Sequence, residues 1–153
     1  MFAGSVLHYF LYLELLSKFI PKVVIPINIT DYSFSVNEFE EPKKYEGAKG
    51  IMMLLTRLLL LDPGTFESHP SMGVGLVSKY RYSMAGEEYK LRSDFKHQIE
   101  KYLPDLQGVD VQVEFKNYTF YISVEINRYV YNFQYDIEGQ NLQSQILNLD
   151  DLK

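Results

Sequence analysis

The C-terminal part of the chain alternates apolar and polar residues over three consecutive runs, which restricts the fold to one that contains an antiparallel sheet. The runs begin at Val109, Tyr118 and Tyr129, and short polar turns separate them. Alternation with a period of two gives each strand one apolar face. Because the turns are short, neighbouring runs should pair antiparallel, and we expect a three-stranded meander that ends at Gly139.

A fourth element follows the meander, since the apolar residues of 142–149 predict either a final strand or a helical turn. We expect the run from Tyr129 to be the outermost strand. Its edge carries Tyr and Asn rather than the Lys and Pro that usually protect an edge, so another chain could add a strand there. The candidate interface residues of this strand are Tyr129, Tyr131, Asn132 and Tyr135.

Two stretches ahead of the sheet repeat their apolar residues at the helical period. Residues 46–61 predict an amphipathic helix that Asp62-Pro63-Gly64 terminates. Glu46 is expected in its first turn, where a negative charge suits the helix dipole. Residues 87–103 predict a second amphipathic helix, which Pro104 stops. The apolar positions are Ile51, Leu54, Leu55, Leu58 and Leu59 in the first helix, and Leu91, Phe95, Ile99, Tyr102 and Leu103 in the second.

Helices that precede an antiparallel sheet indicate the α+β class. We expect two amphipathic helices packed on a three- to four-stranded antiparallel β-meander, with an apolar N-terminal helical extension. Residues 46–153 should form this domain, and residues 1–45 an extension and linker that contacts a partner. Residues 1–20 are apolar around most of a helix. Residues 31–44 are polar and acidic, so we expect a loop or irregular linker there.

Composition removes several classes of function. The chain has 153 residues, no Cys and only three His, which are far apart in sequence, so cysteine nucleophiles and zinc sites have no support. A net charge of -5 does not suit nucleic acid, because phosphate binding uses clustered Lys and Arg. Residues 1–20 lack a basic start and are too polar for a transmembrane helix. We therefore expect no cofactor, metal, nucleic acid or membrane contact.

Paired carboxylates are the remaining catalytic option, since a glycosidase needs two of them. Asp62, Glu67, Glu87 and Glu88 are candidates, but twenty acidic residues make accidental pairs certain. No sequence feature selects one pair. The adjacent Ser and His at 68–69 lack the surrounding G-x-S-x-G motif of a hydrolase. We expect no catalytic residues and a chain that is not an enzyme.

Residues 64–75 predict a loop with special backbone angles. It contains three glycines and one proline, so Gly64, Pro70, Gly73 and Gly75 are expected to shape it. Its spacing matches neither of the two glycine-rich phosphate-binding fingerprints, and no Lys follows at the required place. The glycines are therefore expected to serve the backbone of this loop and not a ligand.

Several motifs follow one another in order over residues 48–153. Leu54-Leu55-Thr56-Arg57 precedes the loop G-T-F-E-S-H-P-S-M-G-V-G-L at 64–76, and the second helix, Pro104 and the meander come next. This order resembles the gene-twenty-five family of contractile-tail wedge proteins. Family members carry Glu-Pro-Arg at the end of the second helix. This chain has Leu103-Pro104-Asp105 there, and only the proline matches.

The resemblance implies a structural subunit of a contractile phage tail baseplate wedge, located in the virion and, during assembly, in the host cytoplasm. Related subunits occur in type VI secretion baseplates. Family members join two other wedge subunits in a core bundle, and they start the sheath through a sheet similar to the sheath's handshake module. The expected partners are wedge subunits, the sheath protein and the tail tube or hub. The remaining candidate interface residues are Arg57, Leu103, Pro104 and Asp105.

Two alternative functions stay open. The family is sometimes described as lysozyme-like, so a tail-associated peptidoglycan hydrolase is one alternative, although no residue pair supports it. The other is a regulatory adaptor that uses the same fold to bind an unrelated bacterial partner. The apolar residues 1–20 support the adaptor and the wedge subunit equally.

Overall fold

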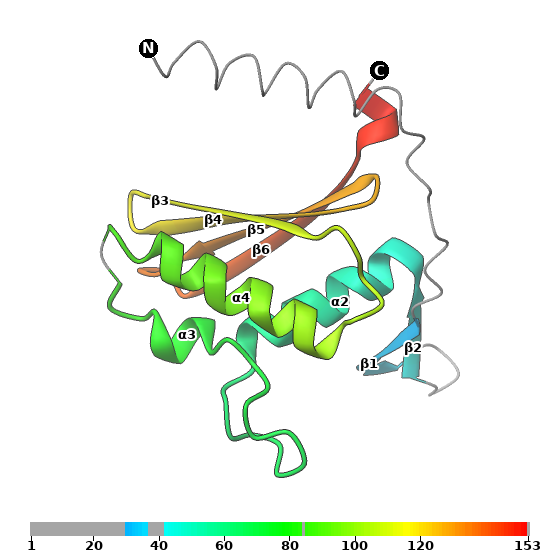
Figure 1. The fold of residues 1–153 in the computed structure, drawn as a ribbon, viewed down its shortest axis with the longest axis horizontal. Helices are drawn as coiled ribbons and strands as arrows, with labels where there is room; N and C mark the ends of the chain where they lie inside the picture. Colours follow the sequence, from blue (N-terminus) through cyan, green and yellow to red (C-terminus); the bar gives the residue numbers. More distant parts are fainter. Residues whose placement is uncertain (1–29, 37–41, 84, 153) are drawn as a thin grey trace, which may run out of the picture.

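A computed structural model describes residues 30–36, 42–83 and 85–152 of the chain, with side chains from residue 46 onward. A four-stranded antiparallel sheet forms one layer, and the helices form a second layer on one face of it (Figure 1). The expected α+β class is confirmed. The helical extension expected for residues 1–20 lies outside the described residues.

The sheet is a meander with the strand order β3-β4-β5-β6. Asn117 and Tyr118 between the first two strands both have positive φ (52° and 57°), as the type I′ turn of a tight hairpin requires. The sequence predicted either a strand or a helical turn at 142–149. The structure has a strand there, β6, and the short 3₁₀ helix η1 follows it. The bounds are β3 Asp110–Lys116, β4 Thr119–Ile126, β5 Tyr129–Asp136, β6 Asn141–Asn148 and η1 Leu149–Leu152.

Two long helices cover one face of the sheet. Helix α2 spans Gly47–Leu60 and helix α4 spans Glu88–Tyr102, each one residue shorter at both ends than expected. A single turn, α3 (Leu76–Lys79), lies between them in sequence. The expectation for Glu46 is wrong, because α2 begins one residue later. Glu46 is the N-cap, with extended backbone, and the first turn of α2 holds no acidic residue.

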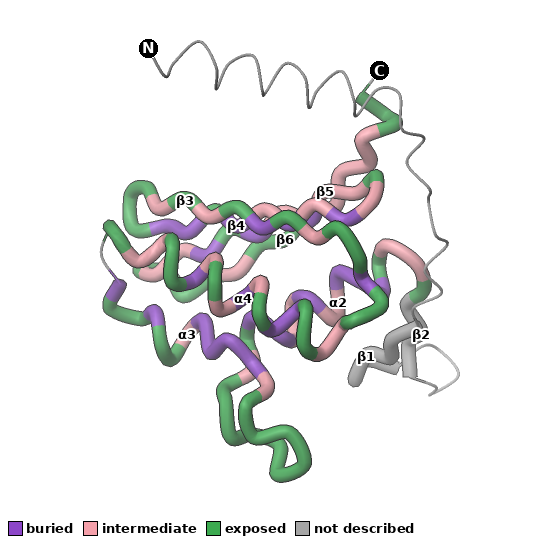
Figure 2. Tube along the Cα trace, in the orientation of Figure 1, coloured by how far each residue is buried: buried purple, intermediate pink, exposed green. Residues whose placement is uncertain are grey.

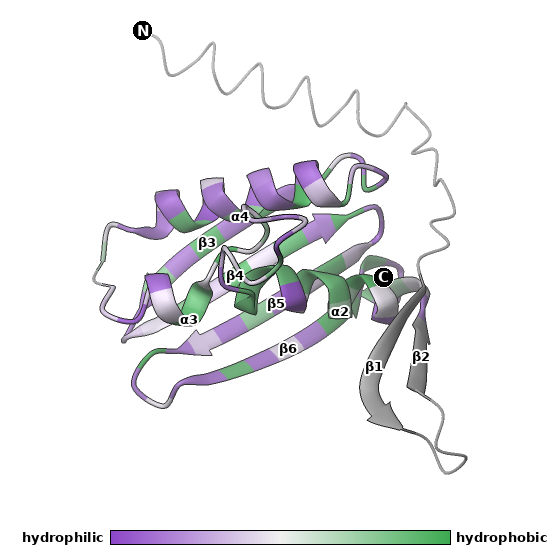
Figure 3. Cartoon of the chain, turned by 90° about the horizontal axis from the view of Figure 1, so that it is seen from below, coloured by the Kyte–Doolittle hydropathy of each residue, from purple (hydrophilic) through white to green (hydrophobic). Residues whose placement is uncertain are grey.

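The core fills the space between the sheet and the two long helices (Figure 2). Leu91, Phe95 and Ile99 of α4 are fully buried, and the ring of Phe95 meets that of Phe133 edge to face at 6.3 Å. The expected alternation along the strands is visible in Figure 3. Tyr118 departs from it, with 59% of its surface exposed, because it belongs to the turn. The buried apolar and aromatic strand residues are Val111, Phe120, Ile122, Val124, Ile126, Tyr131, Phe133 and Tyr135.

A second, two-stranded sheet corrects the expectation of a linker at 31–44. Strands β1 (Thr30–Val36) and β2 (Pro42–Glu46) pair antiparallel and lie beside α2. The sequence of β1, T-D-Y-S-F-S-V, in fact alternates with a period of two. The acidic residues around it obscured that short pattern. Pro42 fits as the first residue of its strand, where a missing N–H is tolerated.

Candidate functional site

The strand expected to form the free edge is an internal one. β5 pairs with β4 on one side and with β6 on the other, so the expected edge at Tyr129 to Tyr135 is wrong. The reason is that β6 adds a fourth strand outside it. Tyr131 and Tyr135 are 0% and 1% exposed and face the helices, which removes them from any surface of the folded domain. Asn132 lies on the opposite face, where its Oδ1 accepts a 2.9 Å hydrogen bond from Ser123.

The two buried tyrosines of β5 are unusual in their polar ends. Within the described part of the chain, the hydroxyls of Tyr131 and Tyr135 have no hydrogen-bond partner. Burial raises the pKa of both phenols above the ordinary value, and the nearby Tyr129 raises that of Tyr131 further. Tyr80 differs, because its hydroxyl donates to Asp94 at 2.9 Å. Burial, followed by this carboxylate, raises the pKa of Tyr80 as well.

Among the strands that the structure describes, β3 and β6 form the two edges of the main sheet, and they differ in charge. β3 carries Asp110, Glu114 and Lys116, and it runs beside α4, from which Arg92 reaches Asp110 at 3.9 Å. β6 reads N-L-Q-S-Q-I-L-N and contains no charge and no proline. Among the described strands it pairs with β5 alone. Charges and prolines are what commonly stop edges from pairing with other chains, so β6 is the unprotected edge.

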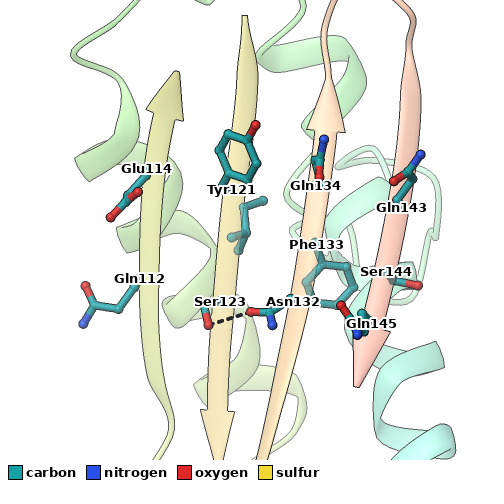
Figure 4. A pocket seen from close by; sticks show the side chains of 11 residues that line it. Gln112, Glu114, Tyr121, Ser123, Asn132, Phe133, Gln134, Gln143, Ser144 and Gln145 are labelled. Atoms are coloured by element: carbon teal, nitrogen blue, oxygen red, sulfur yellow. Dashed lines mark hydrogen bonds between the residues drawn. The ribbon is translucent and has the colours of Figure 1, made fainter. Parts of the chain in front are cut away.

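The face of the sheet that turns away from the helices forms a shallow groove of about 580 Å³ (Figure 4). All four strands contribute amide or hydroxyl side chains to it, and Glu114 is the charged residue among those lining it. At the β6 side the lining consists of Gln143, Ser144 and Gln145. The lining of the groove is therefore polar and nearly uncharged up to the unprotected edge.

Among the glycines of the loop between α2 and α3, Gly73 has the least room for a side chain. Its φ is +111°, and a Cβ at this position would lie 2.1 Å from the carbonyl oxygen of Leu61. The backbone N–H of Val74 donates to the Leu58 carbonyl at 2.8 Å, and that of Gly75 donates to the Leu61 carbonyl at 2.9 Å. The loop thus satisfies carbonyls at the C-terminal end of α2, which have no partner within the helix.

A buried glutamine that the sequence did not single out holds the same loop from the other side. Gln98 of α4 is 8% exposed; its Oε1 accepts from Gly73 N–H at 2.8 Å and its Nε2 donates to the Ser71 carbonyl at 2.9 Å. The Ser71 hydroxyl is bonded to the Tyr102 hydroxyl at 2.7 Å. The sequence feature that could have pointed to Gln98 is a polar residue among the buried positions of α4.

Residues 62–71 project from the domain as an exposed but closed loop (Figure 1). The N–H of Gly64 donates to the Pro70 carbonyl at 2.8 Å, and this hydrogen bond closes the base of the loop. Phe66 in this loop is half exposed. The ring of His69 lies edge-on to that of Tyr102 at 6.0 Å, so the loop rests against the end of α4.

The other candidate interface residues lie at the C-terminal ends of the two long helices. Arg57 is in the last turn of α2 and is partly buried. Leu103 caps α4, and its N–H donates to the Ile99 carbonyl at 2.8 Å. Pro104 and Asp105 follow it and are exposed. The bond between Tyr102 and Ser71 places this end of α4 next to the projecting loop.

Three of the four candidate carboxylates make local hydrogen bonds. Asp62 accepts from the Ser78 hydroxyl, Glu87 accepts from the Ser83 hydroxyl, and Glu88 accepts from the Gly86 N–H at 2.7 Å. These bonds fix a loop and a helix start. No group of three His, Asp or Glu side chains in the described residues could hold a metal ion. Of the helices described, none is both long and apolar enough to span a bilayer.

Compared with models of known protein families and with curated proteins, the chain matches none.

Proposed function

We propose that this chain is a structural subunit of a contractile phage tail baseplate wedge, which joins the wedge core and anchors the sheath by accepting a strand at the edge of its sheet. The observation that carries the proposal is the uncharged eight-residue edge β6. The ordered motifs over residues 48–153 resemble those of the wedge family, and this resemblance indicates a contractile-tail baseplate as the assembly in which the edge would act.

Backbone pairing alone would give such an edge useful affinity. Roughly half of the N–H and C=O groups of β6 point away from β5, because these groups alternate in direction along a strand. Each hydrogen bond to an incoming strand contributes about 0.5–1.5 kcal/mol net. Leu142 and Ile146, which lie on the helix-facing side and are partly buried, would select apolar residues in the added strand.

The contact with the wedge core falls, in this proposal, at the end of the domain where the projecting loop meets α4. Phe66 in the loop has a half-exposed aromatic ring. Pro104 and Asp105, which follow Tyr102 closely in the sequence, are also exposed. The bonds of Gln98 hold the loop in one conformation. A loop that is already ordered loses little entropy on binding, which favours its use as a docking element.

The test is co-expression of the chain with the tail and baseplate proteins encoded beside it, followed by affinity capture. The wild-type chain should retain sheath and wedge subunits. The double variant Gln143→Lys/Gln145→Lys should lose the sheath protein and keep the wedge subunits, since charges protect an edge. A matched control, Gln112→Lys/Gln134→Lys, adds the same charge to the same face on β3 and β5, with no lysine on β6 itself, and should keep both.

A second pair of variants tests the other contact. Phe66→Ala should lose the wedge subunits and keep the sheath protein, whereas Tyr89→Ala, which truncates an exposed aromatic ring at the start of α4, should keep both. A folded wild-type chain that captures neither partner would refute the wedge function. Sheath capture that survives the two lysines on β6 would refute the edge as its site.

A further inference from the structure

The sequence of β6 is complementary to itself when two copies run antiparallel. A two-fold axis perpendicular to the sheet would place the edges of two molecules side by side and keep both sets of helices on one face. Only residues on the same face can then lie opposite one another. Leu142, Ser144 and Ile146 face the helices, because they pair with Tyr135, Phe133 and Tyr131. Gln143 and Gln145 face the outer groove.

One register matches the central pairs of the strand, and only the end pair, Asn141 opposite Leu147, joins a polar to an apolar side chain. With the axis at Ser144, Leu142 of each copy lies opposite Ile146 of the other, and Gln143 lies opposite Gln145. Apolar side chains thus meet on the helix-facing side and amides meet on the outer side, each pair occurring twice. Moving the axis to Gln145 would place Ser144 opposite Ile146 and Gln143 opposite Leu147, which mismatches both faces.

Charge and chain direction also leave this edge open to a second copy. Each molecule carries a net charge of -5, so two copies repel in general, but β6 itself contributes no charge to the seam. After β6, the N–H of Leu149 donates to the Arg128 carbonyl at 2.8 Å, and Arg128 binds Asp150 at 2.9 Å. These bonds hold η1 beside the turn between β4 and β5, which lies inward of the edge.

We propose that the chain, when free of other partners, forms a symmetric dimer in which the two β6 strands pair about Ser144 and the two sheets become one of eight strands. The groove of each molecule, to which Gln143 and Gln145 contribute their side chains at this edge, then continues across the seam. This pairing goes beyond the proposed wedge function and does not depend on it. It covers the edge that would otherwise promote aggregation.

The first measurement is sedimentation velocity of the full chain over a wide range of concentration. The seam is small, so the dimer should dissociate with a Kd of roughly 1–100 µM, as weak interfaces do. Ser144→Lys places two like charges opposite each other at the axis and should yield a monomer with an unchanged melting temperature. Ser144→Thr keeps a small, neutral hydroxyl side chain and should still dimerise.

Because the chain contains no Cys, single cysteines report the register directly. Residues opposite each other in antiparallel strands have Cα atoms about 4.5–5.5 Å apart, which a disulfide can span. With oxidised glutathione as the oxidant, Ser144→Cys should form a covalent dimer and Gln145→Cys should not. A chain that stays monomeric at the highest concentration, or a dimer that persists in Ser144→Lys, overturns the proposal. Preferential cross-linking of Gln145→Cys overturns the register.

Discussion

Replacing Gly73 by Ala should destabilise the domain far more than the same change at Gly86, although the two backbones are alike. Gly73 has a φ of +111° and Gly86 a φ of +109°, so an added Cβ meets the same backbone strain at both positions. At Gly86 nothing lies within 4 Å of the new atom, whereas at Gly73 the Leu61 carbonyl oxygen would be 2.1 Å away. The difference between the two variants isolates that contact.

The size of the difference follows from the bonds around Gly73. The shared strain costs about 1–3 kcal/mol. To relieve the overlap, the loop must move away from the end of α2, which breaks the Gly75–Leu61 hydrogen bond, worth about 1 kcal/mol. It also separates Gly73 from the buried Gln98, which leaves a buried acceptor unpaired at about 1–3 kcal/mol. We therefore expect Gly73→Ala to lose about 2–4 kcal/mol more than Gly86→Ala.

Urea denaturation and thermal melting of both variants check this value. For a chain of this length each kcal/mol lowers the Tm by about 4 °C, so Gly73→Ala should melt roughly 8–16 °C below Gly86→Ala. Gly73→Val, with a larger and β-branched side chain, should not fold at all. Equal unfolding free energies for the two alanine variants would refute the claim that the Leu61 carbonyl requires glycine at this position.

The remaining predictions concern the buried residues of the domain and the central strand β5. Ile122→Asp should unfold the domain, because Ile122 is 1% exposed and an unpaired carboxylate would enter the core, whereas Tyr121→Asp on the outer face should leave the melting curve nearly unchanged. Asn132→Pro should also abolish the cooperative melt, since proline is not tolerated in a strand paired on both sides; a folded variant would mean that β5 is not internal. Tyr131→Phe removes an unpaired buried hydroxyl and should be neutral or more stable by about 1 kcal/mol, whereas Tyr80→Phe, which loses a bond to Asp94, should be less stable. Burial raises the pKa of Tyr131 above its unfolded value near 10. Above about pH 10 the folded state therefore keeps a proton that the unfolded state releases. The free energy of unfolding that this burial contributes is fully present below about pH 10 and falls as the pH rises further. Tyr131→Phe should make that alkaline loss less steep, and an unchanged slope would contradict the shift.

Local periodicity was sufficient for the elements whose burial repeats along the chain. The two long helices and three strands could be predicted because their apolar residues recur at 3.6 or 2 positions, which is a property of each segment alone. β6 was ambiguous for the same reason: as an edge strand it buries little, so its alternation is weak. Because the sequence did not decide whether β6 is a strand, β5 was predicted to be the edge of the sheet. Whether a strand lies at an edge depends on whether another strand pairs with its outer side.

The loop and its support show a different limit. Glycine and proline predicted a loop at 64–75, and the positive φ of Gly73 agrees with that reading. The two bonds of Gln98 could not be predicted, because they join residues 25 and 27 positions apart and depend on how α4 crosses the end of α2. A single polar residue within an apolar helical stripe has many possible partners, and only the tertiary arrangement selects one.

The order of the elements along the chain also sets the order in which a ribosome can complete this domain. The apolar side of α2 leaves the ribosome early, but the sheet that covers it is finished only with β6, about 90 residues later. At roughly 5–20 residues per second that interval lasts roughly 5–20 s, during which a chaperone could bind α2. The edge that we propose to accept another chain, β6, is the last strand of the described sheet to be made. It therefore cannot pair with another chain before the other strands of this sheet have been synthesised.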